Sequence, residues 1–190
     1  MKDIFIFGCP RSGKTILATE LHEKFGYSII SIDSIVDAFE KSMPYVGIGH
    51  HNTDFKFEHL PKFVAQFYKK LKNDYPNANF VIEGWHVLPK KISKHLDLKN
   101  FITLGIGFPN QDVSLKLKEI RQFTYPNDYC KYLDDKQMIK LIENCKSQSL
   151  KIQQECNEMK IEFFDLSNDW DNIQQEIRNF IIQSIVCNAM

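Results

Sequence analysis

Short apolar runs alternate with longer helical patterns along most of this chain. Five of the runs are rich in β-branched and aromatic residues and have the length of buried strands. They span residues 3–7, 27–32, 79–82, 101–106 and 161–166. Because each run is followed by a helical stretch, the pattern predicts an α/β fold with a parallel sheet whose crossover helices cover its faces.

The stretches between the runs repeat apolar residues at helical spacing. Ile139 and Ile142 recur in one of them, and Ile173 and Ile177 recur in the last. The pattern predicts helices at residues 13–25, 34–41, 58–73, 110–119, 134–157 and 168–185. Residues 43–57 and 121–133 fit neither pattern, and long irregular segments of this kind are often binding loops or lids.

The segment between the first predicted strand and helix carries the pattern G-x-x-x-x-G-K-T at residues 8–15. The two glycines allow a turn whose backbone N–H groups point inward, and the helix that follows directs its positive dipole end at the same place. We therefore expect a phosphate-binding loop for a nucleoside triphosphate, formed by Gly8, Arg11, Ser12, Gly13, Lys14 and Thr15. Lys14 is assigned a catalytic role, and the Thr15 hydroxyl is expected to bind Mg²⁺.

Asp33 follows the second predicted strand, at the edge of the sheet where ligands of parallel sheets gather. One interpretation is that Asp33 caps the helix that begins there. The other is that its carboxylate faces the phosphate loop, binds an acceptor hydroxyl and takes its proton. We assign Asp33 this catalytic and substrate-binding role and expect the helix cap as well.

The third predicted strand ends in Glu83, and Gly84 then allows a sharp turn. An acid at this position would lie beside the phosphate loop and could hold a water molecule on Mg²⁺, although a buried salt bridge is the alternative. His86 could contact an anionic acceptor or could be a packed histidine beside Trp85, and both interpretations stay open. We assign Glu83, Gly84 and His86 to substrate binding, and Glu83 to the metal as well.

Arginine is rare in this chain, which has only Arg11, Arg121 and Arg178. Arg121 opens the second irregular segment, and its planar, always-charged group suits phosphate. We expect Arg121 to neutralise charge on the transferring group or to stack on the base, an ordinary surface arginine being the alternative.

The overall charge gives no reason to expect a polyanionic partner. Lysine and arginine total 24 and are balanced by 24 acidic residues, so neither nucleic acid nor an anionic membrane is expected. The five cysteines form no C-x-x-C pair, and no segment is apolar enough for a membrane helix, which favours a cytoplasmic location. We expect a small-molecule partner and a monomer or homodimer.

With these residues in place, the chain resembles the small-molecule kinase branch of P-loop proteins, the group that contains adenylate, shikimate and gluconate kinases. The resemblance implies a three-layer α/β/α fold with a five-stranded parallel sheet of order 2-3-1-4-5, with ATP and Mg²⁺ as cofactors. It implies one domain over residues 1–190, with an acceptor-binding insertion at about 43–74 and a lid at about 121–135. It also implies that Asp33 faces the acceptor, that Arg121 is the first lid arginine, and that Ser167 lies in the adenine-binding loop.

The segment at residues 81–89, V-I-E-G-W-H-V-L-P, is similar to the I-E-G-V-H-L-V-P segment of 2-phosphoglycerate kinases. Trp85 stands where that family has valine, which would reshape an acceptor pocket. Ser31 stands where shikimate kinases have a further aspartate, which argues against shikimate as the acceptor. The resemblance thus implies a kinase and leaves the acceptor open.

The sequence as a whole favours an ATP-dependent kinase that transfers the γ-phosphoryl group to a hydroxyl of a small molecule. The alternative is a nucleotide-binding module that senses or slowly hydrolyses ATP and has no dedicated acceptor. The irregular segment at residues 43–57 favours the kinase, because a sensor has little need for an acceptor-sized pocket.

Overall fold

The computed structural model describes residues 1–50, 54–123 and 129–187 of the chain. Residues 51–53 in the expected acceptor-binding insertion, residues 124–128 in the expected lid, and residues 188–190 lie outside the described residues.

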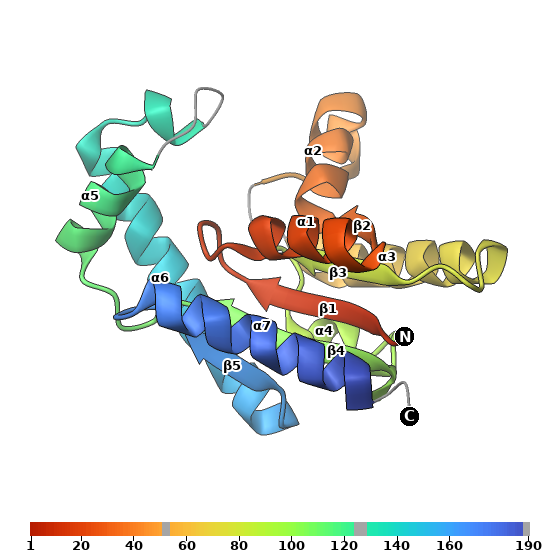
Figure 1. The fold of residues 1–190 in the computed structure, drawn as a ribbon. Coiled ribbons are helices and arrows are strands. Elements are labelled where there is room, and N and C mark those ends of the chain that lie inside the picture. Colours follow the sequence, from red (N-terminus) through yellow and green to blue (C-terminus); the bar gives the residue numbers. More distant parts are fainter. Residues whose placement is uncertain (51–53, 124–128, 188–190) are drawn as a thin grey trace.

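A single five-stranded parallel sheet organises the structure (Figure 1). Its strands are β1 Asp3–Gly8, β2 Ser28–Ser31, β3 Phe80–Gly84, β4 Phe101–Gly107 and β5 Glu162–Asp165. The spatial order is β2-β3-β1-β4-β5, and every pairing is parallel. The order 2-3-1-4-5 is therefore confirmed, and it places the central strand β1 and its loop between β3 and β4.

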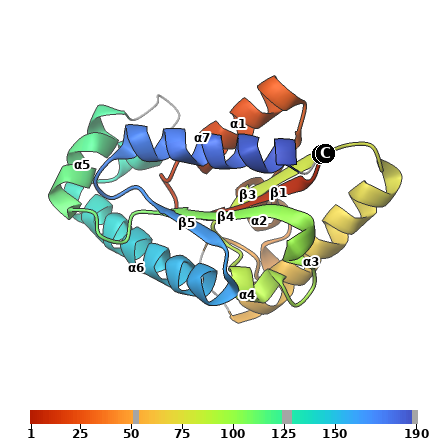
Figure 2. The same ribbon diagram turned by 60° about the horizontal axis from the view of Figure 1, so that its bottom comes forward.

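Helices cover both faces of the sheet (Figure 2). They are α1 Lys14–Phe25, α2 Ile32–Ser42, α3 Asp54–Asp74, α4 Pro89–Ile92, α5 Val113–Gln122, α6 Asp135–Met159 and α7 Trp170–Cys187. Three short 3₁₀ turns complete the described elements, at Pro44–Val46, Leu98–Asn100 and Tyr129–Tyr132.

The side chains of β1 show how the sequence directs this layering. Ile4 and Ile6 belong to the apolar cluster formed with α1 and α7, whereas Phe5 and Phe7 belong to the cluster formed with α2, α3, α4 and α6. Successive side chains of a strand point to opposite faces, so an uninterrupted apolar run fills the core on both sides. The predicted three-layer α/β/α fold is confirmed.

Helix α2 begins one residue earlier than Asp33, at Ile32. Its N-cap is Ser31, whose backbone is extended and whose Oγ accepts a hydrogen bond from the Ser34 backbone N–H at 3.4 Å. The prediction that Asp33 closes the strand and caps the helix is therefore wrong. Serine and aspartate cap helices about equally well, so the residue types alone could not separate the two positions.

Helix α3 begins at Asp54, before the predicted start at residue 58, so the last part of the first irregular segment is helical. Pro61 lies inside this helix, where it removes one backbone hydrogen bond. Leu60 and Val64 from the same turns are fully buried in the core, and this packing holds the helix together around the proline.

Helix α5 and the start of α6 project beyond the sheet (Figure 1). Together with the 3₁₀ turn between them, they form a small apolar cluster of their own, made by Ile120, Cys130, Met138 and Ile142. Among the described helices, none combines the length and apolar composition that crossing a lipid bilayer requires.

Candidate functional site

The loop at residues 8–15 joins β1 to α1 and has an unusual backbone. Gly13 is the N-cap of α1 with φ of 82°, and Arg11 also has a positive φ of 65°. A Cβ atom on Gly13 would lie 2.9 Å from both Gln174 Nε2 and the Trp170 ring, so glycine is required for conformation and for space. Such a backbone, at the start of a helix, presents N–H groups to an anion.

Lys14 and Ser12 hold this loop closed through one carbonyl. The Lys14 ammonium and the Ser12 hydroxyl each donate a hydrogen bond of 2.9 Å to the Cys9 backbone oxygen. Lys14 is only 4% exposed, so its charge lies within the loop instead of in solvent. An ammonium at this position is suited to meeting phosphate oxygens.

The loop is also fixed to α6 from behind. The Ser149 hydroxyl lies 3.2 Å from Cys9 Sγ and 2.8 Å from the Cys145 backbone oxygen, and it accepts a hydrogen bond from the Phe108 backbone N–H at 3.1 Å. Burial acts to raise the pKa of the Cys9 thiol, but hydrogen bonds with Cys145 and Ser149 and nearby lysine charges lower it overall. Helix α6 therefore forms a wall against the phosphate loop.

Glu83 lies at the end of β3, paired in register with Ser31 of β2, and is 1% exposed. Burial raises the pKa of its carboxyl, the charge of Asp33 adds to this, and Lys14 together with hydrogen bonds to Ser31 and Thr15 offset part of it. Its Oε2 has no hydrogen-bond partner among the described residues. A buried carboxylate oxygen without a partner, beside the Thr15 hydroxyl, fits Mg²⁺, which prefers hard oxygen ligands.

Asp33 lies beside Glu83 despite its place in the first turn of α2. Its Oδ1 accepts a hydrogen bond of 3.4 Å from the Trp85 backbone N–H. A Cβ atom on Gly84 would lie 2.5 Å from the Ile32 Cβ and 3.2 Å from Asp33 Oδ1, so only glycine lets β3 end this close to α2. The structure thus brings Lys14, Thr15, Asp33 and Glu83 to one edge of the sheet, as the strand-end rule predicts.

His86 is buried, with 2% of its surface exposed, and its ring packs on the Trp85 ring at a centroid distance of 4.0 Å. Its Nδ1 lies 3.2 Å from the Lys56 ammonium, and its Nε2 has no partner among the described residues. Burial lowers the pKa of His86 to about 2, and the charges of Lys56, His50 and Lys14 act in the same direction. His86 is therefore a neutral group.

Lys56 was missed in the sequence analysis, because it falls in the segment expected to be irregular. It is fully buried, with 0% of its surface exposed, and its ammonium donates a hydrogen bond of 3.1 Å to the Gly49 backbone oxygen. Burial lowers the pKa of Lys56 to about 8, and the charge of Glu40 opposes this. Since an ammonium has no lone pair, His86 Nδ1 must accept from it, which assigns the proton to Nε2.

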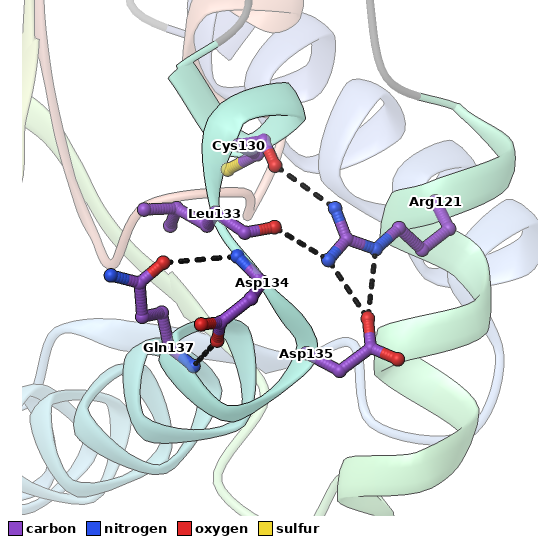
Figure 3. Close-up of polar contacts among 6 residues, drawn as sticks. All are labelled: Arg121, Cys130, Leu133, Asp134, Asp135 and Gln137. Atoms are coloured by element: carbon purple, nitrogen blue, oxygen red, sulfur yellow. Dashed lines mark hydrogen bonds and ion pairs between the residues drawn. The ribbon is translucent and has the colours of Figure 1, made fainter.

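Arg121 has its hydrogen-bond partners in the segment between α5 and α6 and at the first residue of α6 (Figure 3). Its Nε and Nη2 donate to Asp135 Oδ1 at 3.3 and 2.8 Å, while Nη1 donates to the Cys130 carbonyl at 3.1 Å and Nη2 to the Leu133 carbonyl at 2.7 Å. The guanidinium thus joins the end of α5 to the start of α6. To reach phosphate, Arg121 would have to exchange these partners.

Ser167 lies just after β5 and is 6% exposed. Its hydroxyl donates to Asp165 and accepts a hydrogen bond of 2.9 Å from the Asn110 backbone N–H. It therefore joins the loop after β5 to the loop after β4, at the same edge of the sheet as the phosphate loop. Its backbone N–H also donates a hydrogen bond of 2.9 Å to Asp165 Oδ1, so Asp165 holds both the hydroxyl and the N–H of Ser167.

A cleft of about 440 Å³ lies next to the phosphate loop. Pro10 of that loop, His50 and Trp85 line it together with residues of α6, namely Leu141, Asn144, Cys145, Ser147, Gln148 and Lys151. The contribution of α6 was missed from the sequence, although Asn144, Gln148 and Lys151 recur at helical spacing.

A G-x-x-x-x-G-K-T loop after the central strand of a sheet in this order defines the fold of the P-loop small-molecule kinases. Solved structures of such kinases are similar to this chain over nearly its whole length. A gluconokinase from Sinorhizobium meliloti 1021 matches with a TM-score of 0.60 and 13% identity, covering 96% of this chain and 92% of its own. A shikimate kinase from Bacteroides thetaiotaomicron matches with a TM-score of 0.55 and 16% identity, covering 97% and 98%.

A sugar kinase from Janibacter sp. HTCC2649 has a TM-score of 0.56 and 10% identity, covering 95% of this chain and 94% of its own. No protein-family model matches the chain, and no curated protein sequence matches it. At these identities the likeness shows the fold, and the chemistry has to be argued from the site.

Proposed function

We propose that this protein is an ATP-dependent kinase that transfers the γ-phosphoryl group to a hydroxyl of a small molecule. The observation that carries the proposal is the convergence of Lys14, Thr15, Asp33 and Glu83 at one edge of the sheet, next to a cleft large enough for a small acceptor. The similar solved structures support it, since their names are those of small-molecule kinases.

In this proposal the phosphate loop binds the triphosphate, and Lys14 and the loop amides neutralise charge that develops on the transferring group. Thr15 and Glu83 would hold Mg²⁺, either directly or through water. When bound, Mg²⁺ supplies positive charge that screens the phosphate oxygens from one another. Arg121 would add a further charge after leaving its present partners, and the loop containing Ser167 would contact the base.

Asp33 is assigned to the acceptor side of the reaction. Its carboxylate orients the acceptor hydroxyl and takes its proton while the oxygen attacks the γ-phosphorus and the bond to ADP breaks. Asp33 is only partly buried, and its Oδ1 accepts a hydrogen bond from the backbone N–H of Trp85, a residue that lines the cleft. The products are ADP and a phosphate monoester.

The segment at residues 43–74 is proposed as the acceptor-binding insertion and the segment at 121–135 as the lid, both within a single domain. The described part of the first segment supplies His50 to the cleft and Lys56 to the wall behind it. These contacts support an acceptor site, which a nucleotide sensor with slow ATPase activity would not need.

ADP formation distinguishes the two functions. A kinase should form ADP faster when one metabolite of a diverse library is added, and mass spectrometry should then find the phosphorylated metabolite. An ATPase would release inorganic phosphate at the same rate whatever is added. Equal phosphate release across the whole library would refute the kinase proposal.

A further inference from the structure

The cleft beside the phosphate loop is lined by two amides, one lysine, a histidine, a serine and apolar side chains. Among its described lining residues there is no carboxylate. Asn144, Gln148 and Lys151 come from α6 at spacings of four and three residues, so their side chains lie on the same face of the helix. An anion that enters this cleft would therefore meet hydrogen-bond donors without meeting a like charge.

Lys151 provides the formal charge on the α6 wall. It is exposed, and its ammonium has no ion-pair or hydrogen-bond partner among the residues that the structure describes. By comparison, Lys90 of α4 forms an ion pair with Glu158, which lies nearer the C-terminal end of α6 than Lys151. An unpaired ammonium at the edge of a cleft is available to a ligand, and a compact charge on a flexible stem suits carboxylate or phosphate.

A second cation lies behind the opposite wall. The Lys56 ammonium is 5.7 Å from the centre of the Trp85 ring, and that ring lines the cleft. His86 packs between the same groups, and His50, another lining residue, has its ring 5.4 Å from that of His86. Because Lys56 is fully buried, water screens its charge weakly, and its field reaches the cleft through Trp85.

Asp37 and Glu40 of α2 lie close to His50 on this side of the cleft. Its Nε2 is 3.6 Å from a Glu40 oxygen and 3.8 Å from an Asp37 oxygen. Asp37 is also paired with Lys41 at 2.7 Å. The charge of Glu40 also acts on the buried Lys56 ammonium, and neither Asp37 nor Glu40 lines the cleft.

We propose that the acceptor is a small hydroxylated anion and that its carboxylate or phosphate group binds Lys151 in this cleft. The inference rests on the proposed kinase function and adds the acceptor's chemical class. Asn144 and Gln148 bind further oxygens of the acceptor, and the Trp85 ring packs against its carbon skeleton. Because the Trp85 backbone is hydrogen bonded to Asp33, an acceptor packed on the Trp85 ring has its hydroxyl near the Asp33 carboxylate, which takes the hydroxyl proton.

The test uses matched compounds that differ in charge. After calorimetry has established that Mg²⁺–ATP binds, ADP formation is measured with glycerate and gluconate, with glycerol 3-phosphate, and with the neutral polyols glycerol and sorbitol. We expect at least one anion to raise the rate about tenfold or more, and its neutral partner to have no effect. The carboxylates and the phosphate compound separate the two sources of negative charge.

Variants of α6 then test Lys151 itself. Lys151→Met should raise KM for the active anion about tenfold or more with little change in kcat or in KM for ATP, and Lys151→Arg should restore most of the loss. Lys140→Met is the matched control, because Lys140 is an exposed lysine of the same helix that does not line the cleft.

The inference is overturned if a neutral polyol is phosphorylated, if no anion of the set is, or if Lys151→Met leaves KM unchanged. Phosphorylation of a neutral polyol would leave the kinase function intact. Failure of ATP to bind at the calorimetry step would instead overturn the proposed function.

Discussion

Replacing Glu83 with glutamine should make the protein more stable and less active. Glu83 is 1% exposed, and its Oε2 has no hydrogen-bond partner among the described residues. Leaving a buried acceptor unsatisfied costs about 1–3 kcal/mol, and more when the group is charged. Glutamine keeps the shape and one acceptor oxygen for Thr15 and Ser31, but it removes the charge.

The loss of attraction to Lys14 opposes this gain. The pKa of Glu83 is raised even though Lys14 lowers it, so burial and the charge of Asp33 outweigh that attraction. We therefore expect Glu83→Gln to raise the free energy of unfolding by about 1 kcal/mol, which corresponds to about 2–4 °C in Tm for a domain of this size. The measurement is thermal unfolding without nucleotide at neutral pH.

The pH dependence of this gain has a defined sign. The pKa of Glu83 in the folded protein is above its ordinary value of 4.5, so the folded state holds a proton that the unfolded state loses. Wild-type stability from this group therefore falls as the pH rises from about 4.5 through the folded pKa, while the variant is unaffected. The difference in Tm should be small in acid, grow over that interval and then stay constant.

Added Mg²⁺–ATP should reverse the order of stability. The wild-type protein gains stability from every ligand that binds only its folded state, and the variant should gain less because Glu83 is proposed to hold Mg²⁺. Turnover of the variant should fall about tenfold or more. Glu155→Gln is the control, because Glu155 is also buried but accepts a hydrogen bond of 2.9 Å from the Lys90 backbone N–H. A Tm below wild type at neutral pH would contradict the cost of burying the Glu83 charge, and unchanged turnover would contradict its role in holding Mg²⁺.

Three further variants test other parts of the site. Asp33→Asn should lower kcat by about 100-fold or more, as expected for loss of a general base, with ATP affinity in calorimetry nearly unchanged; equal kcat would contradict its role. Gly13→Ala should destabilise the protein by about 1–2 kcal/mol in denaturant unfolding and abolish nucleotide binding, because φ at residue 13 is 82° and the added Cβ would meet Trp170 and Gln174. Normal nucleotide binding by this variant would contradict the requirement for glycine. Arg121→Lys keeps the positive charge but loses the planar guanidinium that joins Cys130, Leu133 and Asp135, so kcat should fall about tenfold or more in steady-state assays. A wild-type kcat would mean that Arg121 serves only the local structure.

The strands and the phosphate loop could be predicted from the sequence because each depends on local physics. An apolar run such as Ile4 to Phe7 must be buried on both faces, and the spacing of Gly8, Gly13 and Lys14 defines one backbone conformation. The strand order was implied by the resemblance to P-loop kinases, since no local pattern specifies which strands are neighbours.

Side-chain partners across the fold could not be predicted in the same way. The burial of Lys56 depends on its contacts with the Gly49 carbonyl and the His86 ring, and no sequence pattern near Lys56 predicts these contacts. The wall that α6 adds to the cleft depends on packing between Ser149 and Cys9, which are 140 residues apart in the sequence. Contacts of this range follow from the complete fold.

Calorimetric titration with ATP in saturating Mg²⁺ measures whether the loop at residues 8–15 binds a nucleoside triphosphate. We expect one ATP to bind per chain. Lys14→Ala, which removes the ammonium bonded to the Cys9 carbonyl, should weaken binding about tenfold or more while the protein remains folded. Absence of heat with both ATP and GTP from folded wild-type protein, or equal affinity in Lys14→Ala, would contradict nucleotide binding by this loop.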